Sequence, residues 1–147
     1  MKSYVTFTRK GLFAIFVAIV GIVLICSEIC AASNKTTNAS TNVERITFIK
    51  NSGYTPLSNE PQTKTVVIPE SFSDVYNNYN NTQRAAGYDL TEFKGCEVTI
   101  YTYSIETPVG YEGESVFNMI VYKNRVIGGD VSSNALGGFM LPILKSE

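Results

Sequence analysis

Residues 98–130 read VTIYTYSIETPVGYEGESVFNMIVYKNRVIGGD, and this stretch decides the fold. Residues 98–105 and 115–122 are rich in β-branched and aromatic side chains, which favour strands. Because successive side chains of a strand point to opposite faces, Tyr101 and Tyr103 share one face of the first strand. The stretch therefore predicts an antiparallel sheet built from consecutive strands.

Two turns connect these strands. Residues 107–113 contain one proline and two glycines, so we expect an exposed loop there. Lys123 and Asn124 make a two-residue turn, in which Asn124 tolerates a positive φ. A return strand begins at residues 125–127, and the sequence Gly-Gly-Asp at 128–130 is expected to interrupt or bend it.

Two helices and one further strand are expected before this stretch. Residues 43–52 have helical spacing, with Asn42 as the expected N-cap, and residues 63–68 form a β-branched run typical of a strand. The strongest helical pattern follows, and Ser71 with Asp74 resembles its capping box. Its apolar face comprises Phe72, Val75, Tyr76, Tyr79 and Ala86, and Gly87 ends it.

These elements predict an α+β fold. One main helix packs on an antiparallel sheet of three to four strands, and a short helix precedes it. The arrangement is cystatin-like by analogy. An N-terminal transmembrane or signal helix comes before the short helix.

The N-terminal segment predicts export. Residues 11–27 carry no charge, and three bases but no acid precede them, so we expect an N-terminus in the cytoplasm. One interpretation is an uncleaved membrane anchor, and the other is a signal peptide cleaved after Ala32. Residues 1–32 thus form the anchor or signal peptide, residues 33–42 a flexible linker, and residues 43–147 the exported domain.

Charge and composition exclude several functions. Residues 1–32 hold three bases and one acid, so the remainder has 9 bases, 12 acids and a net charge of −3. No basic field is available for nucleic acid. The chain has no histidine, which excludes a Ser-His-Asp triad and histidine-ligated metals. Cys96 is the one cysteine of the exported part, so we expect a small buried side chain and no internal disulfide.

No motif for a cofactor, a metal or a phosphate loop is present, and we expect none of these. Two kinds of hydrolase need no histidine. One uses paired carboxylates, for which Glu97, Glu106, Glu112, Glu114 and Asp130 are available. The other pairs a serine, Ser132 or Ser133, with a lysine, for which Lys94, Lys123 and Lys145 are the candidates.

The favoured hypothesis is a non-catalytic binding module that contacts the membrane through residues 11–27. Its partner would be a protein or a cell-wall ligand. Tyrosine and arginine dominate many binding surfaces, so the candidates are Tyr101, Tyr103 and Arg125, together with Asp130 and the loop 107–113. The alternatives are a small hydrolase and a subunit of a larger membrane complex.

An ordered set of segments resembles the domain of unknown function 4830 family (DUF4830) of Firmicutes. The segments are 68–80, 87–90, 101–103, 121–130 and 136–140. One departure is Asn124, where the family often has glycine, and both residues tolerate a positive φ. The resemblance implies a short exported or membrane-anchored protein, and it implies no activity.

Overall fold

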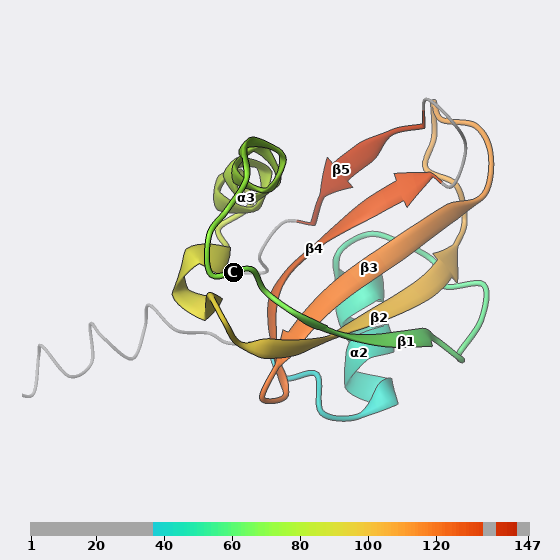
Figure 1. Ribbon diagram of the computed structural model, residues 1–147. Helices are drawn as coiled ribbons and strands as arrows, with labels where there is room; N and C mark the ends of the chain where they lie inside the picture. The colour runs from blue at the N-terminus through green and yellow to red at the C-terminus, as the bar shows by residue number, and fades with distance from the viewer. Residues whose placement is uncertain (1–36, 134–137, 144–147) are drawn as a thin grey trace, which may run out of the picture. The chain divides into compact units, whose positions relative to one another are not determined.

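The computed structural model describes residues 37–133 and 138–143 (Figure 1). These residues belong to a compact unit that begins at Thr36. The expected membrane or signal segment at 11–27 lies outside the described residues. Among the residues that are described, no helix is both long enough and apolar enough to cross a membrane.

The sheet is an antiparallel meander of five strands in the order β1-β2-β3-β4-β5. Its strands are β1 (Gln62–Val67), β2 (Glu97–Ile105), β3 (Ser115–Tyr122), β4 (Arg125–Ser133) and β5 (Met140–Pro142). The α+β class is confirmed, but the expected number of three to four strands is too small. The strand that the prediction lacks is β5, which has three residues and ends in proline, so it carries no alternating pattern.

Helices pack on both faces of the sheet (Figure 1). Helix α2 (Asn42–Asn51) buries Phe48 and Ile49 in a cluster with Tyr103 and Phe117. Helix α3 (Asp74–Ala85) and the short 3-10 helix η1 (Leu90–Phe93) border a second cluster around Val98. Tyr103 and Val98 are five positions apart on β2, so they point to opposite faces.

Both helices begin at different residues from those expected. The cap of α2 is Thr41, whose side chain accepts from the N–H of Glu44 while the Glu44 carboxylate accepts from the N–H of Thr41. The cap of α3 is Ser73, not Ser71. Val75 is 80% exposed, because the helix turns only its Tyr76 and Tyr79 side toward the sheet.

The hairpin turn is confirmed and the strand after it is longer than expected. Lys123 and Asn124 have φ of 45° and 66°, the left-handed pair that a two-residue hairpin requires. Strand β4 continues through Gly128 to Ser133 instead of being interrupted. Its pairing with β3 shifts register between Ile120 and Val121. The glycines therefore mark an irregularity within a strand and not its end.

The linker expected at residues 33–42 ends earlier than predicted, because its last residues pack against the domain. Ala39 is 1% exposed, and its N–H donates to the backbone oxygen of Asn124 at 2.8 Å. Arg45 on α2 is also buried and donates to the backbone oxygen of Ala39 at 2.8 Å. The residues from Thr37 onward thus belong to the folded unit.

Candidate functional site

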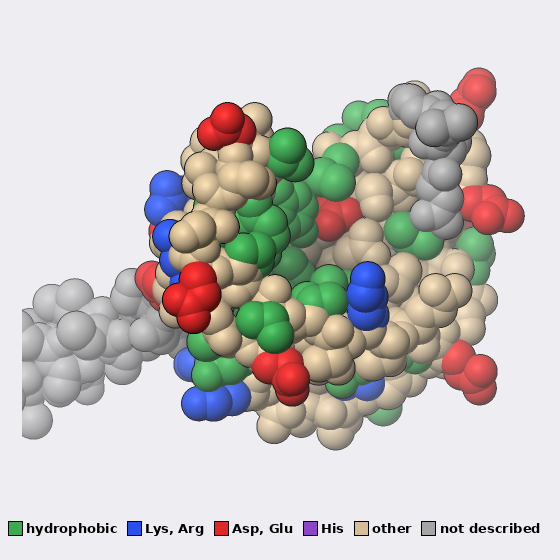
Figure 2. Space-filling view, viewed as in Figure 1, with side chains coloured by type: hydrophobic (Ala, Val, Ile, Leu, Met, Phe, Trp, Pro, Cys, Tyr) green, Lys and Arg blue, Asp and Glu red, His purple; other side chains and the backbone are tan. Residues whose placement is uncertain are grey.

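Helix α3 covers one end of its sheet face and leaves the other end open. Val98 and Ile120 are buried at the covered end. Thr102 and Asn118, which follow on the same face, are only half-buried, and Ser104 is exposed. Figure 2 shows a hollow between α3 and the sheet, with apolar side chains along the helix and an acidic side chain within it. We call this region the hollow.

A row of polar side chains crosses three strands at the hollow. Thr102 pairs with Asn118 and Asn118 pairs with Asp130, so all three side chains point to the α3 face. The Thr102 hydroxyl donates to Oδ1 of Asn118 at 2.8 Å. The Asn118 amide donates to Oδ1 of Asp130 at 2.9 Å and to Oγ of Ser132 at 3.2 Å. The row fixes the orientation of the Asp130 carboxylate.

Tyr79 connects this row to the helix. Its hydroxyl donates to Oδ2 of Asp130 at 3.0 Å. Burial, together with the adjacent Asp130 charge and the hydrogen bond, raises the pKa of Tyr79 far above its usual range. Tyr79 therefore stays protonated and serves as a hydrogen-bond donor.

Asp130 is a buried carboxylate that has no cationic partner in the part of the chain that the structure describes. The residue is 6% exposed. Within residues 37–133 and 138–143, the one ion pair joins Arg84 to Asp89 at 2.9 Å. Buried charges are usually paired with an opposite charge, so Asp130 is an exception that calls for an explanation.

Three aromatic rings line the helix side of the hollow. Phe72 and Tyr76 have ring centroids 4.5 Å apart, and Tyr76 and Tyr79 have centroids 6.1 Å apart. All three rings are half-buried and pack against the cluster around Val98. An aromatic wall beside a carboxylate combines apolar contact area with negative charge.

Gln83 sets the distance between α3 and the sheet. Its amide nitrogen donates to the backbone oxygen of Gly129 at 2.9 Å, and its amide oxygen accepts from the N–H of Gly129 at 2.8 Å. The side chain thereby pairs with the strand as a neighbouring backbone would. Because Gln83 and Tyr79 lie one turn apart, both hold the helix on β4.

Only one of the four residues expected to bind a partner lies in the hollow, and it is Asp130. Tyr103 is 0% exposed, so its expected exposure is wrong; its hydroxyl lies between Arg45 at 3.0 Å and Asn42 at 2.7 Å. Tyr101 is half-buried, with the Arg45 guanidinium 3.9 Å from its ring centroid. Arg125 is exposed at the hairpin turn.

Asn118 and Thr102 were not among the predicted site residues, whereas Tyr79 was predicted on the apolar face of the main helix. One sequence signal pointed to Asn118. It is a polar residue between Phe117 and Met119 in a mostly apolar strand. Its relation to Asp130 depends on strand register, and the bulge shifts that register.

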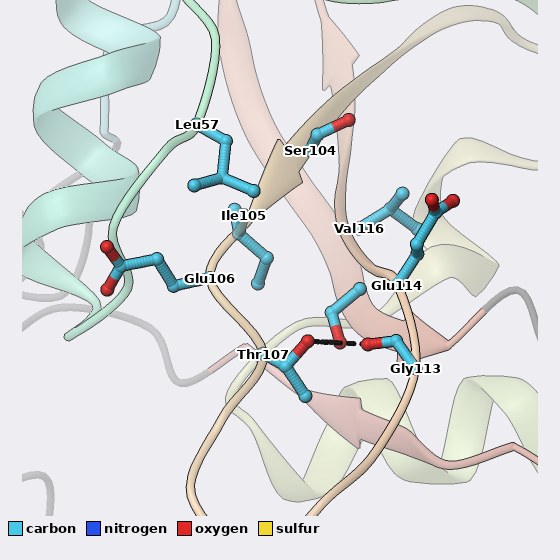
Figure 3. A pocket seen from close by; sticks show the side chains of 9 residues that line it. Leu57, Ser104, Ile105, Glu106, Thr107, Gly113, Glu114 and Val116 are labelled. Carbon is cyan, nitrogen blue, oxygen red and sulfur yellow. Dashed lines mark hydrogen bonds between the residues drawn. The ribbon is translucent and has the colours of Figure 1, made fainter.

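A second concavity lies beside the loop 107–113, at the end of the β2–β3 hairpin where this loop connects the two strands. This open pocket has a volume of about 590 Å³ and includes Leu57, Ile105 and Val116 in its lining. Figure 3 shows Glu106 and Glu114 on opposite sides, with their carboxylates directed apart. This geometry does not present a pair of carboxylates to one substrate.

The lysines named for a serine–lysine pair have other contacts. The Lys94 nitrogen lies 4.7 Å from the ring centroid of Phe72, and the Lys123 nitrogen lies 5.0 Å from that of Tyr122. Lys145 lies outside the described residues. Ser132 accepts from Asn118, and Cys96 is half-buried and unpaired.

The carboxylate of Asp89 has structural contacts. Asp89 caps η1 and accepts from Thr91, Asn80 and Arg84. Burial alone would raise the pKa of Asp89, but these hydrogen bonds outweigh it and hold the pKa well below its usual range. Within the part of the chain that the structure describes, no three acidic or cysteine side chains gather as metal ligands.

Fold and site together define a small α+β domain with an open sheet face and a buried carboxylate. A comparison with protein families assigns this domain to one of them. The model of the domain of unknown function family DUF4830 matches residues 48–131, so the chain belongs to this family. The match runs from α2 to β4 and includes Tyr79, Asn118 and Asp130. No curated protein and no solved structure matches the chain.

Proposed function

We propose that this protein is a non-catalytic binding module on the outer side of the cell membrane, and that the hollow is its binding surface. The observation that carries the proposal is the Asp130 carboxylate, which is 6% exposed, fixed by Tyr79 and Asn118, and without a cationic partner among the described residues. Binding sites are concave and mostly apolar with a few oriented polar groups, and the hollow has this composition.

The location rests on the N-terminal sequence. Residues 11–27 anchor the chain as a single span, with the N-terminus in the cytoplasm and the domain outside. The alternative is secretion after cleavage at Ala32. A Gram-positive host of the Firmicutes is proposed on the resemblance, and the partner is then a protein or a cell-wall ligand.

The location is tested by adding protease to intact cells that carry the full chain with a C-terminal epitope. We expect the epitope to be digested before lysis and to sediment with membranes. An epitope that is protected until lysis would contradict the exported location. Free protein in the medium that begins at Ser33 would instead establish the secreted form.

The binding surface is tested by placing a photo-crosslinking amino acid at Met140, which is 55% exposed and pairs with Ser132 on the same face as Asp130. The matched control is the exposed Asn51, at the end of α2. We expect a crosslinked partner in native membranes from Met140 and none from Asn51. Equal adducts from both positions, or adducts from Asn51 alone, would show that the hollow is not the binding surface.

A further inference from the structure

We propose that the hollow binds a primary ammonium group, which forms the ion pair that Asp130 lacks among the described residues. This inference rests on the proposed binding function and adds the chemistry of the ligand. A carboxylate offers about four lone-pair positions, and Tyr79 and Asn118 occupy two of them. The remaining positions accept no further hydrogen bond from the described residues, so a ligand can supply donors to them.

The surroundings of Asp130 favour a cation over a neutral group. Its two protein partners are a hydroxyl and an amide, which orient the carboxylate without neutralising its charge. An ammonium donor adds the Coulomb attraction between opposite charges to the hydrogen bond with the carboxylate, and a neutral donor does not. An ammonium group is the partner that removes the net charge from this buried position.

The aromatic wall adds a second contact for such a ligand. Tyr79 on α3 contacts the carboxylate through its hydroxyl, and the Tyr76 ring lies 6.1 Å from the Tyr79 ring, centroid to centroid. Aromatic faces attract ammonium groups within about 6 Å. The methylene groups of an alkylammonium chain would pack on the same rings. A carboxylate beside aromatic rings is therefore a suitable site for a lysine-like side chain.

Among residues 37–133 and 138–143, the cations on this face do not fill the site. Lys64 pairs with Ile100, so it points to the α3 face, but it lies on β1. Three strand spacings separate β1 from β4, which is about 14 Å. Lys94 lies over the ring of Phe72, outside hydrogen-bond reach of the carboxylate.

The test uses the full-length, ¹⁵N-labelled chain in micelles of a non-ionic sugar detergent and follows the side-chain amide of Asn118 by NMR. Acetyl-lysine methylamide is the probe, and acetyl-norleucine methylamide is the uncharged control. Alanine methylamide presents an α-ammonium group. We expect saturable shifts at Asn118 with an ammonium probe and none with the uncharged control.

Variants test whether Asp130 is the carboxylate that binds the ammonium probe. We expect Asp130→Asn to weaken binding of the lysine probe about tenfold or more. The matched control Glu114→Gln removes an exposed carboxylate of the loop region and leaves binding unchanged.

Each outcome has a defined meaning. Binding of either ammonium probe supports the inference, and the probe that binds distinguishes a lysine side chain from a free α-amine. Equal shifts with the uncharged control, no shift with either ammonium probe, or full affinity in Asp130→Asn would overturn it. Probe comparison needs only the unchanged chain, so it remains decisive if a variant fails to fold. A crosslinked partner at Met140 without ammonium binding would leave the proposed function intact.

Discussion

Tyr79 makes the unfolding free energy of the protein depend on pH in the alkaline range. Its folded pKa lies far above the unfolded value near 10, so the folded state holds the proton more tightly. The stability from this group is fully present below about pH 10 and is lost as the pH rises beyond it. Burial also raises the pKa of Tyr88, to about 12, so the two groups act in the same direction.

We therefore expect Tyr79→Phe to reduce the alkaline loss of unfolding free energy, by up to about 1.4 kcal/mol per pH unit. At neutral pH the variant loses one hydrogen bond to a charged group and is less stable by about 1.5–3 kcal/mol. Urea unfolding at pH 7, 10 and 11 measures both effects. Identical alkaline slopes for the two proteins would contradict the role of Tyr79.

Gly129 is required by a close approach between β3 and β4. A Cβ at this position would collide with the backbone oxygen of Asn118 and lie 2.7 Å from Cδ1 of Ile143. At Gly128 the nearest atom is Oε1 of Gln83 at 2.8 Å, which belongs to a side chain. A strand backbone cannot move away as a side chain can.

We expect Gly129→Ala to destabilise the protein by about 3 kcal/mol and to displace Asn118 from Asp130. Gly128→Ala is the comparison, and we expect a smaller loss. Denaturant unfolding gives the free energies, and the Asn118 side-chain amide resonance reports the displacement. A Gly129→Ala protein as stable as the unchanged chain would refute the steric argument.

At the scale of elements, α3 depends on β4 more than on its own helix propensity. Asparagine is a poor helix former, and four asparagines lie in this helix. The two hydrogen bonds between Gln83 and Gly129 and the one between Tyr79 and Asp130 attach it to the strand. Tertiary contacts thus compensate for the weak local preference.

We expect Gln83→Leu to destabilise the protein by about 2–3 kcal/mol, because it leaves the buried N–H and oxygen of Gly129 without their side-chain partner. Asn81→Leu, an exposed position on the same helix, is the matched control and should change stability by less than about 0.5 kcal/mol. Hydrogen exchange of the α3 amides would locate the loss. Unchanged exchange in Gln83→Leu would show that other contacts hold the helix.

At the scale of the whole molecule, the residues before α2 complete the fold. Arg45 is 8% exposed, and its guanidinium donates to the backbone oxygens of Ala39 and Ser40 and to the hydroxyl of Tyr103. Without residues 37–41 the buried guanidinium would lose two of these acceptors. The segment therefore closes the α2 face of the domain.

We expect a chain that starts at Thr36 to keep the stability of the domain. A chain that starts at Asn42 loses about 3 kcal/mol or more, because it leaves a buried charge incompletely paired. Thermal unfolding of the two proteins checks this. Equal midpoints would mean that residues 37–41 make no net contribution.

Local sequence patterns were sufficient to predict the positions of most helices and strands. Strand β3 and the Lys123–Asn124 turn were predicted at their observed positions, and β1, β2, α2 and α3 were predicted within a few residues. The 3-10 helix η1 was not predicted. Strand alternation and turn chemistry act over a few residues, so a single sequence reveals them. The helix caps were displaced because several serine, threonine and asparagine residues compete near each helix start.

The sequence by itself determined the α+β class, the hairpin, the family resemblance and the absence of histidine chemistry. Tertiary structure alone decided which polar residues meet. Thr102, Asn118 and Asp130 form one row only through strand register, and Tyr79 reaches Asp130 across 51 positions of the chain. Tyr103 was expected at the surface and is buried, because its burial depends on α2 packing over that face. Strand register and the packing of each helix on a sheet face depend on residues far apart in the sequence, so no local pattern specifies them.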